Sequence, residues 1–406
     1  MEHVVIVDYL RSAFSRSRPG EPDRDVFNNV FMVDLAGLLI KKIIERTKIN
    51  PEEINDVLTG CTIQSGEQML LGGRMVAMQA ELPMNVPAQA IDRVCCSGMS
   101  AMHQGAMEIE LGFSDIVFAG GIEHMTHRPM QPQYYQPGGN VPGTPQRKMD
   151  PKIVQKYDMA TAMSMGLTAE KLFAECKDEL GISREDMDKW GVRAHNLAEK
   201  ALDEGYFKGE ILPLEVELAD GGKRIIDSDQ AIRRGATLEA TVSLNPSFKP
   251  DGAITPGNSS PLNAGAAMML LMSRKRAKEY GLKPMARIVS IGWAGVDSSV
   301  MGKGPVPASE MALKHAGLEV KDIDYWEINE AFTIVALYAI KKLGIDPDKV
   351  NIKGGATAIG HPLAASGPRL TGTLARILKE KNARYGCATL CGGGGQGGAT
   401  IIERLD

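Results

Sequence analysis

Short apolar runs alternate along the chain with longer stretches whose apolar residues recur at helical spacing. Val4 to Val7 form a continuous apolar run before the charged Asp8, which predicts a buried first β-strand rather than a secretory signal. Residues 33–44 place apolar side chains every three or four positions, which predicts an amphipathic helix. Glycine supplies 44 residues and recurs beside the short runs. Strands and helices that alternate in this way predict an α/β fold.

The two ends of the chain share this pattern, which predicts a duplicated α/β core. Residues 53–58 lead from a charged turn into a strand, and roughly forty residues later Cys95 opens a helix-like segment. Residues 322–327 repeat the charged turn and strand, and His361 follows at a similar distance. Each half then reaches a strand that ends in glycines. The competing explanation is chance, because α/β chains repeat similar elements without duplication.

A long insertion interrupts the first half. Its glycine-ended strand at 115–121 is separated from the apolar run at 264–272 by roughly 140 residues, whereas the second half closes at once with a strand at 397–403. The insertion holds a Pro/Gln/Tyr-rich segment at 130–147 and two charged, helix-like runs. It is either a loop domain over a site between the halves or a solvated segment without function. We predict three domains: residues 1–122 plus 259–276, 123–258, and 277–406.

Composition excludes several classes of function. The net charge is −4 and aromatic residues make up 5% of the chain, so we expect no nucleic-acid partner. The apolar run at 266–272 is far shorter than the ~20 residues of a membrane helix. The six cysteines, at 61, 95, 96, 176, 387 and 391, form no Cys-x-x-Cys pair and have no histidine at ligand spacing. We therefore expect a cytoplasmic protein without a membrane or metal site.

Two neighbouring cysteines occupy a position suited to nucleophilic chemistry. Cys95 and Cys96 follow an extended segment and precede a predicted helix at 100–111. The unpaired N–H groups at a helix N-terminus stabilise a thiolate and can bind an oxyanion. These residues do not by themselves choose between Cys95 and Cys96, and a buried structural cysteine is the alternative.

The second half presents two further candidates. His361 follows a glycine-flanked turn at the duplicate of the cysteine position, so symmetric packing of the halves would bring its imidazole to the thiol as a base. Cys391 precedes four glycines, which leave backbone N–H groups accessible to a substrate. The alternatives are a structural histidine and a flexible turn beside a structural cysteine.

Four motifs resemble the fingerprints of the thiolase family, and they stand in the family's order. They are Cys95-x-Ser97, Asn329-Glu330-Ala331-Phe332, Gly360-His361-Pro362 and Cys391-x-Gly393. The resemblance covers essentially the whole chain and implies the thiolase-like fold, a layered α-β-α-β-α core with an inserted loop domain, in a homodimer or homotetramer. It also favours Cys95 as the nucleophile, two residues before Ser97. Cys96 stands where the family more often has glycine, and its role is open.

The resemblance implies an acyltransferase that cleaves 3-oxoacyl-CoA with coenzyme A through an acyl-enzyme on Cys95. His361 would deprotonate Cys95, and Cys391 would act as acid and then as base. The resemblance also implies two oxyanion sites, one of which would consist of His361 and a water held by Asn329. The other would consist of the backbone N–H groups of Cys95 and Gly393.

Coenzyme A is expected as a substrate rather than a permanent cofactor, since no Walker or dinucleotide motif is present. By resemblance, Ser260 contacts the pantetheine and Arg233 the nucleotide, and Met165 and Met301 line the pocket. The motif residues Ala331 and Phe332 are assigned to the same binding site. Lys223, Arg224 and Arg234 either add charge for the 3′-phosphate or form a solvated face.

Acyl-chain length depends on Ser164. Acetoacetyl-specific relatives tend to carry His-Met where this chain has Ser164-Met165, so we expect a degradative, β-oxidation type of enzyme that accepts longer chains. In the competing interpretation, Tyr134 or Tyr135 fills the pocket and acetoacetyl-CoA is preferred. The alternative functions are an acetoacetyl-CoA thiolase that works in the condensing direction and, more remotely, a non-catalytic scaffold of this fold.

Overall fold

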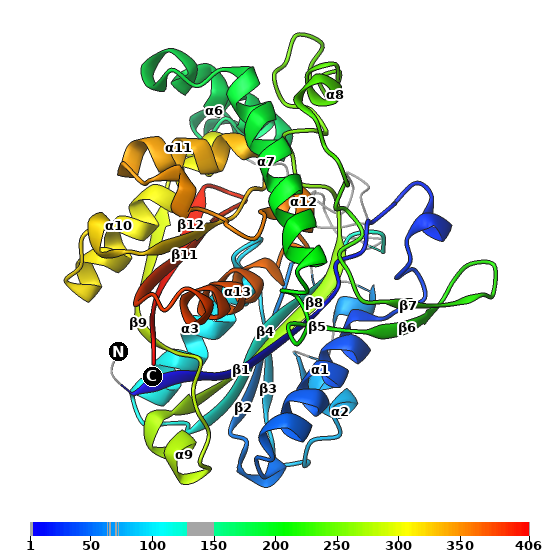
Figure 1. The fold of residues 1–406 in the computed structure, drawn as a ribbon, viewed down its shortest axis with the longest axis vertical. Coiled ribbons are helices and arrows are strands. Elements are labelled where there is room, and N and C mark those ends of the chain that lie inside the picture. The colour runs from blue at the N-terminus through cyan, green and yellow to red at the C-terminus, as the bar shows by residue number, and fades with distance from the viewer. Residues whose placement is uncertain are drawn as a thin grey trace.

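The computed structural model describes residues 3–62, 64, 66–69, 71, 73–127 and 150–405. One large mixed sheet is packed against helices, which confirms the predicted α/β class (Figure 1). The segment 130–147, with Tyr134 and Tyr135, lies outside the described residues, so its predicted effect on the pocket stays a prediction.

The large sheet joins ten strands of the described chain in the order β10-β11-β12-β9-β1-β8-β4-β2-β3, with β5 beside β1. Their bounds are β1 (Val4–Ser12), β2 (Asp56–Cys61), β3 (Ala88–Ile91), β4 (Ile116–His124), β5 (Ile211–Leu212), β8 (Ala264–Ser273), β9 (Ala286–Gly295), β10 (Tyr325–Ile328), β11 (Tyr385–Gly392) and β12 (Gln396–Arg404).

The strand order repeats between the two parts of the sheet. In the first part β2 and β4 are parallel, and β8 and β1 follow antiparallel. In the second part β10 and β11 are parallel, and β12 and β9 follow antiparallel. The parts meet where Val5 pairs with Arg287 and Ile6 with Ala286. This order confirms the duplicated core, whereas the exact domain boundaries stay a prediction.

Helices form three layers around the two parts of the sheet (Figure 1). The helices of the core are α1 (Met32–Thr47), α2 (Arg74–Gln79), α3 (Ser97–Glu110), α9 (Arg274–Glu279), α10 (Pro305–Ala316), α11 (Thr333–Leu343), α12 (Ala356–Ile359) and α13 (Ser366–Glu380). Helix α1 packs on β1, β4 and β8, and α10 packs on β9, β11 and β12. Helices α3 and α13 contact each other and strands of both parts. They form the middle layer of the predicted α-β-α-β-α arrangement.

The first turn of α3 packs closely against the first turn of α13 and the residues just before it. A Cβ on Gly98 would lie 2.0 Å from the Ala364 carbonyl oxygen, and a Cβ on Gly367 would lie 2.6 Å from the Met99 Cβ. Only glycine permits contacts this short, because any side chain would have to occupy the partner's volume. The chain before α3 and the chain before α13 therefore reach one place.

The segment between β4 and β8 is joined to the core by buried charges. Besides β5, its described elements are α4 (Pro151–Lys156), α5 (Met159–Ala162), α6 (Met165–Leu180), α7 (Arg184–Asp203), α8 (Leu238–Val242) and the hairpin of β6 (Leu214–Glu217) and β7 (Lys223–Ile226). Arg11 on β1 pairs with Glu210 and Asp229 of this segment, each at 2.7 Å, and all three side chains are fully buried. Removing one partner would leave a buried charge uncompensated, so these pairs fix the segment on the core.

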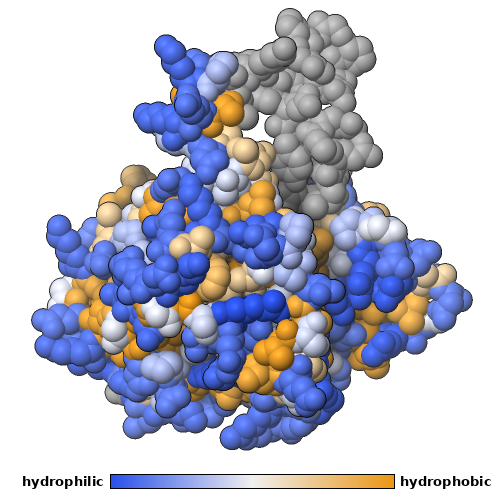
Figure 2. Space-filling view, turned by 90° about the horizontal axis from the view of Figure 1, so that it is seen from above, coloured by the Kyte–Doolittle hydropathy of each residue, from blue (hydrophilic) through white to orange (hydrophobic). Residues whose placement is uncertain are grey.

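The surface of the described chain is mixed. Figure 2 shows one face on which hydrophilic side chains predominate and apolar side chains occupy scattered areas between them. Among the described residues, none of the helices combines the length and the apolar character needed to cross a membrane.

Replacing Gly98 by alanine should destabilise the protein by about 1–3 kcal/mol, because the new methyl group would overlap the Ala364 carbonyl. Gly20→Ala is the matched control, since a Cβ there would have no atom within 4 Å. Urea unfolding of both variants measures the difference. Equal free energies of unfolding would contradict the close contact of α3 and α13.

Candidate active site

Cys95 lies in a tight turn just before α3. The preceding residue, Val94, has a φ of +50°, a conformation that is rare for a β-branched side chain. Its carbonyl oxygen accepts hydrogen bonds from the Ser97 hydroxyl at 2.6 Å and the Thr62 hydroxyl at 2.9 Å. The Ser97 hydroxyl also accepts the Arg93 N–H at 2.8 Å. Ser97, the serine of the Cys-x-Ser motif, therefore holds a strained turn that presents Cys95.

His361 is held from its backbone and from one ring nitrogen. Its N–H donates to Asn263 Oδ1 at 2.7 Å, and its Nδ1 lies 2.5 Å from the Ser366 hydroxyl. That hydroxyl donates to the Pro362 carbonyl oxygen at 3.0 Å, so its oxygen accepts a hydrogen bond from the His361 Nδ1–H. These partners assign the tautomer with hydrogen on Nδ1, which leaves the lone pair of Nε2 available as a base.

The surroundings of His361 favour the neutral imidazole. Burial, reinforced by the positive charge of Arg369, lowers the pKa of His361 to about 3. Asn329 is fully buried, and its side-chain nitrogen lies 3.4 Å from each ring nitrogen. Asn329 Oδ1 has no partner among the described residues. The ring is thus an uncharged base beside an amide with unused acceptor capacity.

Cys391 lies at the end of β11, fully buried and close to Cys95. Burial, together with the neighbouring Cys95, raises the pKa of the Cys391 thiol, so this group holds its proton near neutral pH. The turn that follows packs on the Cys95 turn, because a Cβ on Gly393 would lie 3.0 Å from Val94 Cγ1. A thiol that keeps its proton beside a second thiol can act as a proton donor.

A cavity of about 710 Å³ opens over these groups. It is lined by Cys95, His361 and Gly393 and by five of the residues expected to bind the substrate: Met165, Ser260, Met301, Ala331 and Phe332. Apolar side chains that the sequence had not singled out complete the wall, among them Met125, Met159, Met163, Leu262 and Leu363. Asn329 and Cys391 lie behind this lining, in contact with His361 and near Cys95 respectively.

Arg233 is not among the residues that line the cavity. Its side chain is exposed, and its backbone N–H lies 3.2 Å from His195 Nδ1. Two of the three neighbouring basic residues are paired with acids. Lys223 contacts Glu215, and Arg234 contacts Glu199 and Asp203. Their charge is partly satisfied within the chain, which favours the interpretation as a solvated face.

Sequence reasoning missed the two residues that orient His361. Ser366 stands five residues after the histidine and is the first residue of α13, so a search for hydroxyls at the start of the next helix would have found it. Asn263 lies 98 residues away in the chain, directly before β8, and its side-chain oxygen accepts the hydrogen bond of the His361 backbone N–H. No local pattern marks it, because the contact exists only once the two halves have packed together.

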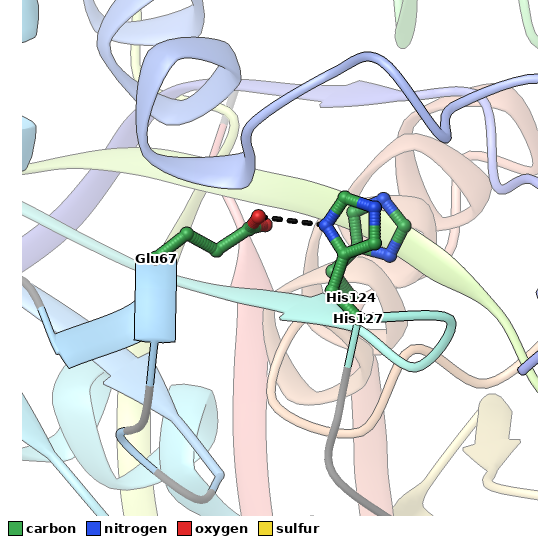
Figure 3. A group of neighbouring side chains, drawn as sticks. All are labelled: Glu67, His124 and His127. Atoms are coloured by element: carbon green, nitrogen blue, oxygen red, sulfur yellow. Dashed lines mark hydrogen bonds and ion pairs between the residues drawn. The ribbon is translucent and has the colours of Figure 1, made fainter. Parts of the chain in front are cut away.

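Glu67, His124 and His127 form another cluster of possible ligand atoms, which the cysteine and histidine spacings did not predict (Figure 3). Glu67 Oε2 lies 2.6 Å from His127 Nδ1, and the two imidazoles are stacked with centroids 3.6 Å apart and planes 8° from parallel. A metal bound by imidazole lies near the plane of the ring, so one ion cannot suit two parallel stacked rings. Each Nε2 also faces a backbone carbonyl, of Phe27 or Asn28. This arrangement fits a hydrogen-bonded stack.

We compared the chain with models of known protein families, and two of them match it. Residues 4–275 match the thiolase N-terminal domain, and residues 282–404 match the thiolase C-terminal domain. The chain belongs to the thiolase family. The thiolase resembles "3-ketoacyl-CoA thiolase" of Marinobacter nauticus, with 41% identity over 99% of this chain and 98% of that protein. It is 42% identical to the protein of the same name from Vibrio vulnificus, over the full length of both chains.

A solved structure of an acetyl-CoA acetyltransferase from Bacillus anthracis shares the thiolase's architecture. The TM-score is 0.84 and the sequence identity 34%, and the alignment covers 100% of this chain and 99% of that one. The fold predicted from the motifs is therefore confirmed over the whole chain.

Ser366→Ala should change the tautomer of His361, because the Nδ1–H loses its acceptor. Nitrogen-15 NMR of histidine-labelled protein should show His361 shifting toward the Nε2–H form. Ser309→Ala is the control, since Ser309 is equally buried and does not contact His361. Unchanged ring shifts in Ser366→Ala would show that the tautomer is set by another group.

Proposed function

We propose that this thiolase cleaves 3-oxoacyl-CoA with coenzyme A and yields acetyl-CoA and a shortened acyl-CoA. The observation that carries the proposal is the convergence of Cys95 and a neutral His361 on one deep cavity, with a protonated Cys391 behind it. Full-length relatives at 41–42% identity are named for the same reaction.

In the first half-reaction, His361 Nε2 accepts the proton of the Cys95 thiol. The thiolate attacks the C3 carbonyl carbon, and collapse of the adduct breaks the bond between C2 and C3. The acyl group remains on Cys95 as a thioester. The other product is the enolate of acetyl-CoA, which takes the proton of Cys391 and leaves as acetyl-CoA.

In the second half-reaction, the Cys391 thiolate accepts the proton of an incoming CoA thiol. The CoA sulfur then attacks the thioester carbonyl, and the Cys95 thiolate leaves with the return of the proton held by His361. Both steps are balanced without an external acid, base or oxidant. The raised pKa of Cys391 suits both roles, because the thiol stays protonated until an enolate arrives and the thiolate that remains is then a strong base toward the CoA thiol.

Charge that develops on oxygen requires two binding sites. The buried amide of Asn329, with an unpartnered Oδ1, supports its role in holding a water beside His361. The backbone N–H groups of Cys95 and Gly393 would bind the oxygen of the thioester. Loss of one such donor typically lowers the rate by ~10²–10³.

Coenzyme A would enter along the wall that contains Ser260, Ala331 and Phe332, with Met165 and Met301 beside the reacting carbons. Arg233 would reach the nucleotide end outside the cavity. The protein needs no permanent cofactor for these steps. We also propose the three domains at 1–122 plus 259–276, 123–258 and 277–406, a cytoplasmic location, and a homodimer or homotetramer.

Synthesis of acetoacetyl-CoA from two acetyl-CoA molecules is the second candidate. The same residues catalyse both directions, and the structurally similar Bacillus anthracis protein is named an acetyl-CoA acetyltransferase. Substrate preference, rather than the catalytic residues, distinguishes the two candidates.

Cys95→Ser should abolish thiolysis of 3-oxoacyl-CoA, because a serine hydroxyl is far less ionised than a thiol. Brief incubation of the wild type with acyl-CoA, followed by peptide mass spectrometry, should place the acyl group on Cys95. An adduct on Cys96 with Cys95 unmodified would refute the assignment.

The two proton-transfer residues should fail at different steps. Cys391→Ala should retain slow acylation of Cys95 while complete thiolysis collapses, whereas His361→Ala should impair acylation itself. Stopped-flow acylation rates measure the difference. If His361→Ala acylates at the wild-type rate, His361 is not the base.

Chain-length preference should favour substrates longer than four carbons. The apolar wall around Met125, Leu262 and Leu363 can bury additional methylenes, each contributing up to ~0.8 kcal/mol of binding. Values of kcat/KM for C4, C6, C8 and C10 substrates test this. A monotonic fall from C4 would favour the acetoacetyl-CoA candidate and leave the family assignment intact.

A further inference from the structure

Cys96 is a buried thiol with no role in the reaction described above. Its side chain is fully inaccessible and does not line the cavity, although Cys95 beside it does. Burial, with the nearby thiols of Cys95 and Cys391, raises the pKa of Cys96, so it stays protonated and is a poor nucleophile. The position nevertheless lies between the two turns that carry the reactive sulfurs.

The Cys96 thiol rests on the strand that carries Cys391. Its Sγ lies 4.0 Å from the Leu390 carbonyl oxygen, and a Cβ built on Gly392 would lie 2.9 Å from that Sγ. The sulfur therefore fills the space that a side chain at position 392 would need. Leu390 and Gly392 are the two neighbours of Cys391, so the contact touches the backbone on both sides of that residue.

The backbone of Cys96 is held in place by hydrogen bonds at the start of α3. Cys96 is the N-cap residue of α3, its N–H donates to the Arg93 carbonyl at 3.0 Å, and its carbonyl accepts the Ser100 N–H at 2.8 Å. A second contact lies parallel to it, where Val94 meets Gly393. Two side chains of the Cys95 turn thus rest on two glycines of the Cys391 turn.

We propose that Cys96 is a positioning residue whose thiol, fitted against Gly392, sets the separation between the Cys95 turn and the Cys391 turn. The proposal rests on the proposed function, because the separation matters only if a proton passes between substrate on Cys95 and the thiol of Cys391. Close-packed interiors transmit such changes, and a displacement of about 1 Å can lower a rate about 100-fold.

A double-mutant cycle tests the fit. Cys96→Gly removes the spacer, and Gly392→Ala adds a methyl group whose carbon would lie 2.9 Å from the Cys96 sulfur and overlap it. Each single variant should lower kcat by about tenfold to 100-fold, with the KM for CoA unchanged. Combining the two should restore most of the lost kcat, because the methyl group of residue 392 then occupies the vacated space. Cys387→Ala, a fully buried cysteine on the same strand, should retain the wild-type kcat.

Thermal unfolding of each variant separates positioning from folding. A purely structural role would lower the melting temperature and leave the kcat of the folded enzyme unchanged. Wild-type kcat in Cys96→Gly, or losses in the double variant that equal the product of the single losses, would overturn the proposal.

A readout independent of turnover separates this proposal from the proposed function. Cross-linking of Cys95 to Cys391 by 1,3-dibromoacetone, followed by mass spectrometry, should give a lower yield in each single variant and recover in the double variant, because the yield depends on the separation of the two sulfurs. If the double variant recovers in this assay but the wild type does not cleave 3-oxoacyl-CoA, the proposed function is wrong and the fit of Cys96 against Gly392 stands. Identical cross-linking yields in all four proteins would refute the fit.

Discussion

The active site depends on the backbone contact between the first turns of α3 and α13. Gly98 lies against the Ala364 carbonyl. On the neighbouring strands, Gly60 lies against the backbone at Gly98, and Gly121 lies against the Ala364 carbonyl. Each contact leaves no room for a Cβ. Because the two helices start at one place, Cys95, two residues before α3, and His361, five residues before α13, line the same cavity. The duplication of the core becomes a catalytic arrangement through this contact, since each half supplies a different group at an equivalent position.

The second constraint is the exclusion of water from the reactive groups. His361, Cys391 and Asn329 are buried, and burial opposes charge on the imidazole and on the thiol. The His361 imidazole and the Cys391 thiol are therefore both uncharged at rest. In such surroundings, preorganised donors act on developing charge far more strongly than they would in water. The strained turn at Val94 and the fixed tautomer of His361 belong to the same preorganisation.

Sequence alone determined the class of fold, the duplicated core and the family. The apolar runs at Val4 and around 264–272 became β1 and β8, and the amphipathic stretch at 33–44 became α1. These features are local, because the period of apolar residues and the positions of glycine follow from the backbone geometry of one element. The predicted helix at 100–111 began three residues earlier, at Ser97, since the turn of Val94 already orients the chain for a helix. Four short motifs in order sufficed to indicate the family.

Tertiary structure decided what no local pattern contains. The orientation of His361 depends on Asn263, 98 residues away, and the role of Cys96 depends on Gly392 in the other half. Arg233, chosen by resemblance, lies outside the cavity lining, and the stacked pair of His124 and His127 had no signal in the cysteine and histidine spacing. Sequence fixes which groups are available through the preferences of each segment. Distances, burial and proton positions arise from packing between segments far apart in the chain, and those quantities determine the chemistry.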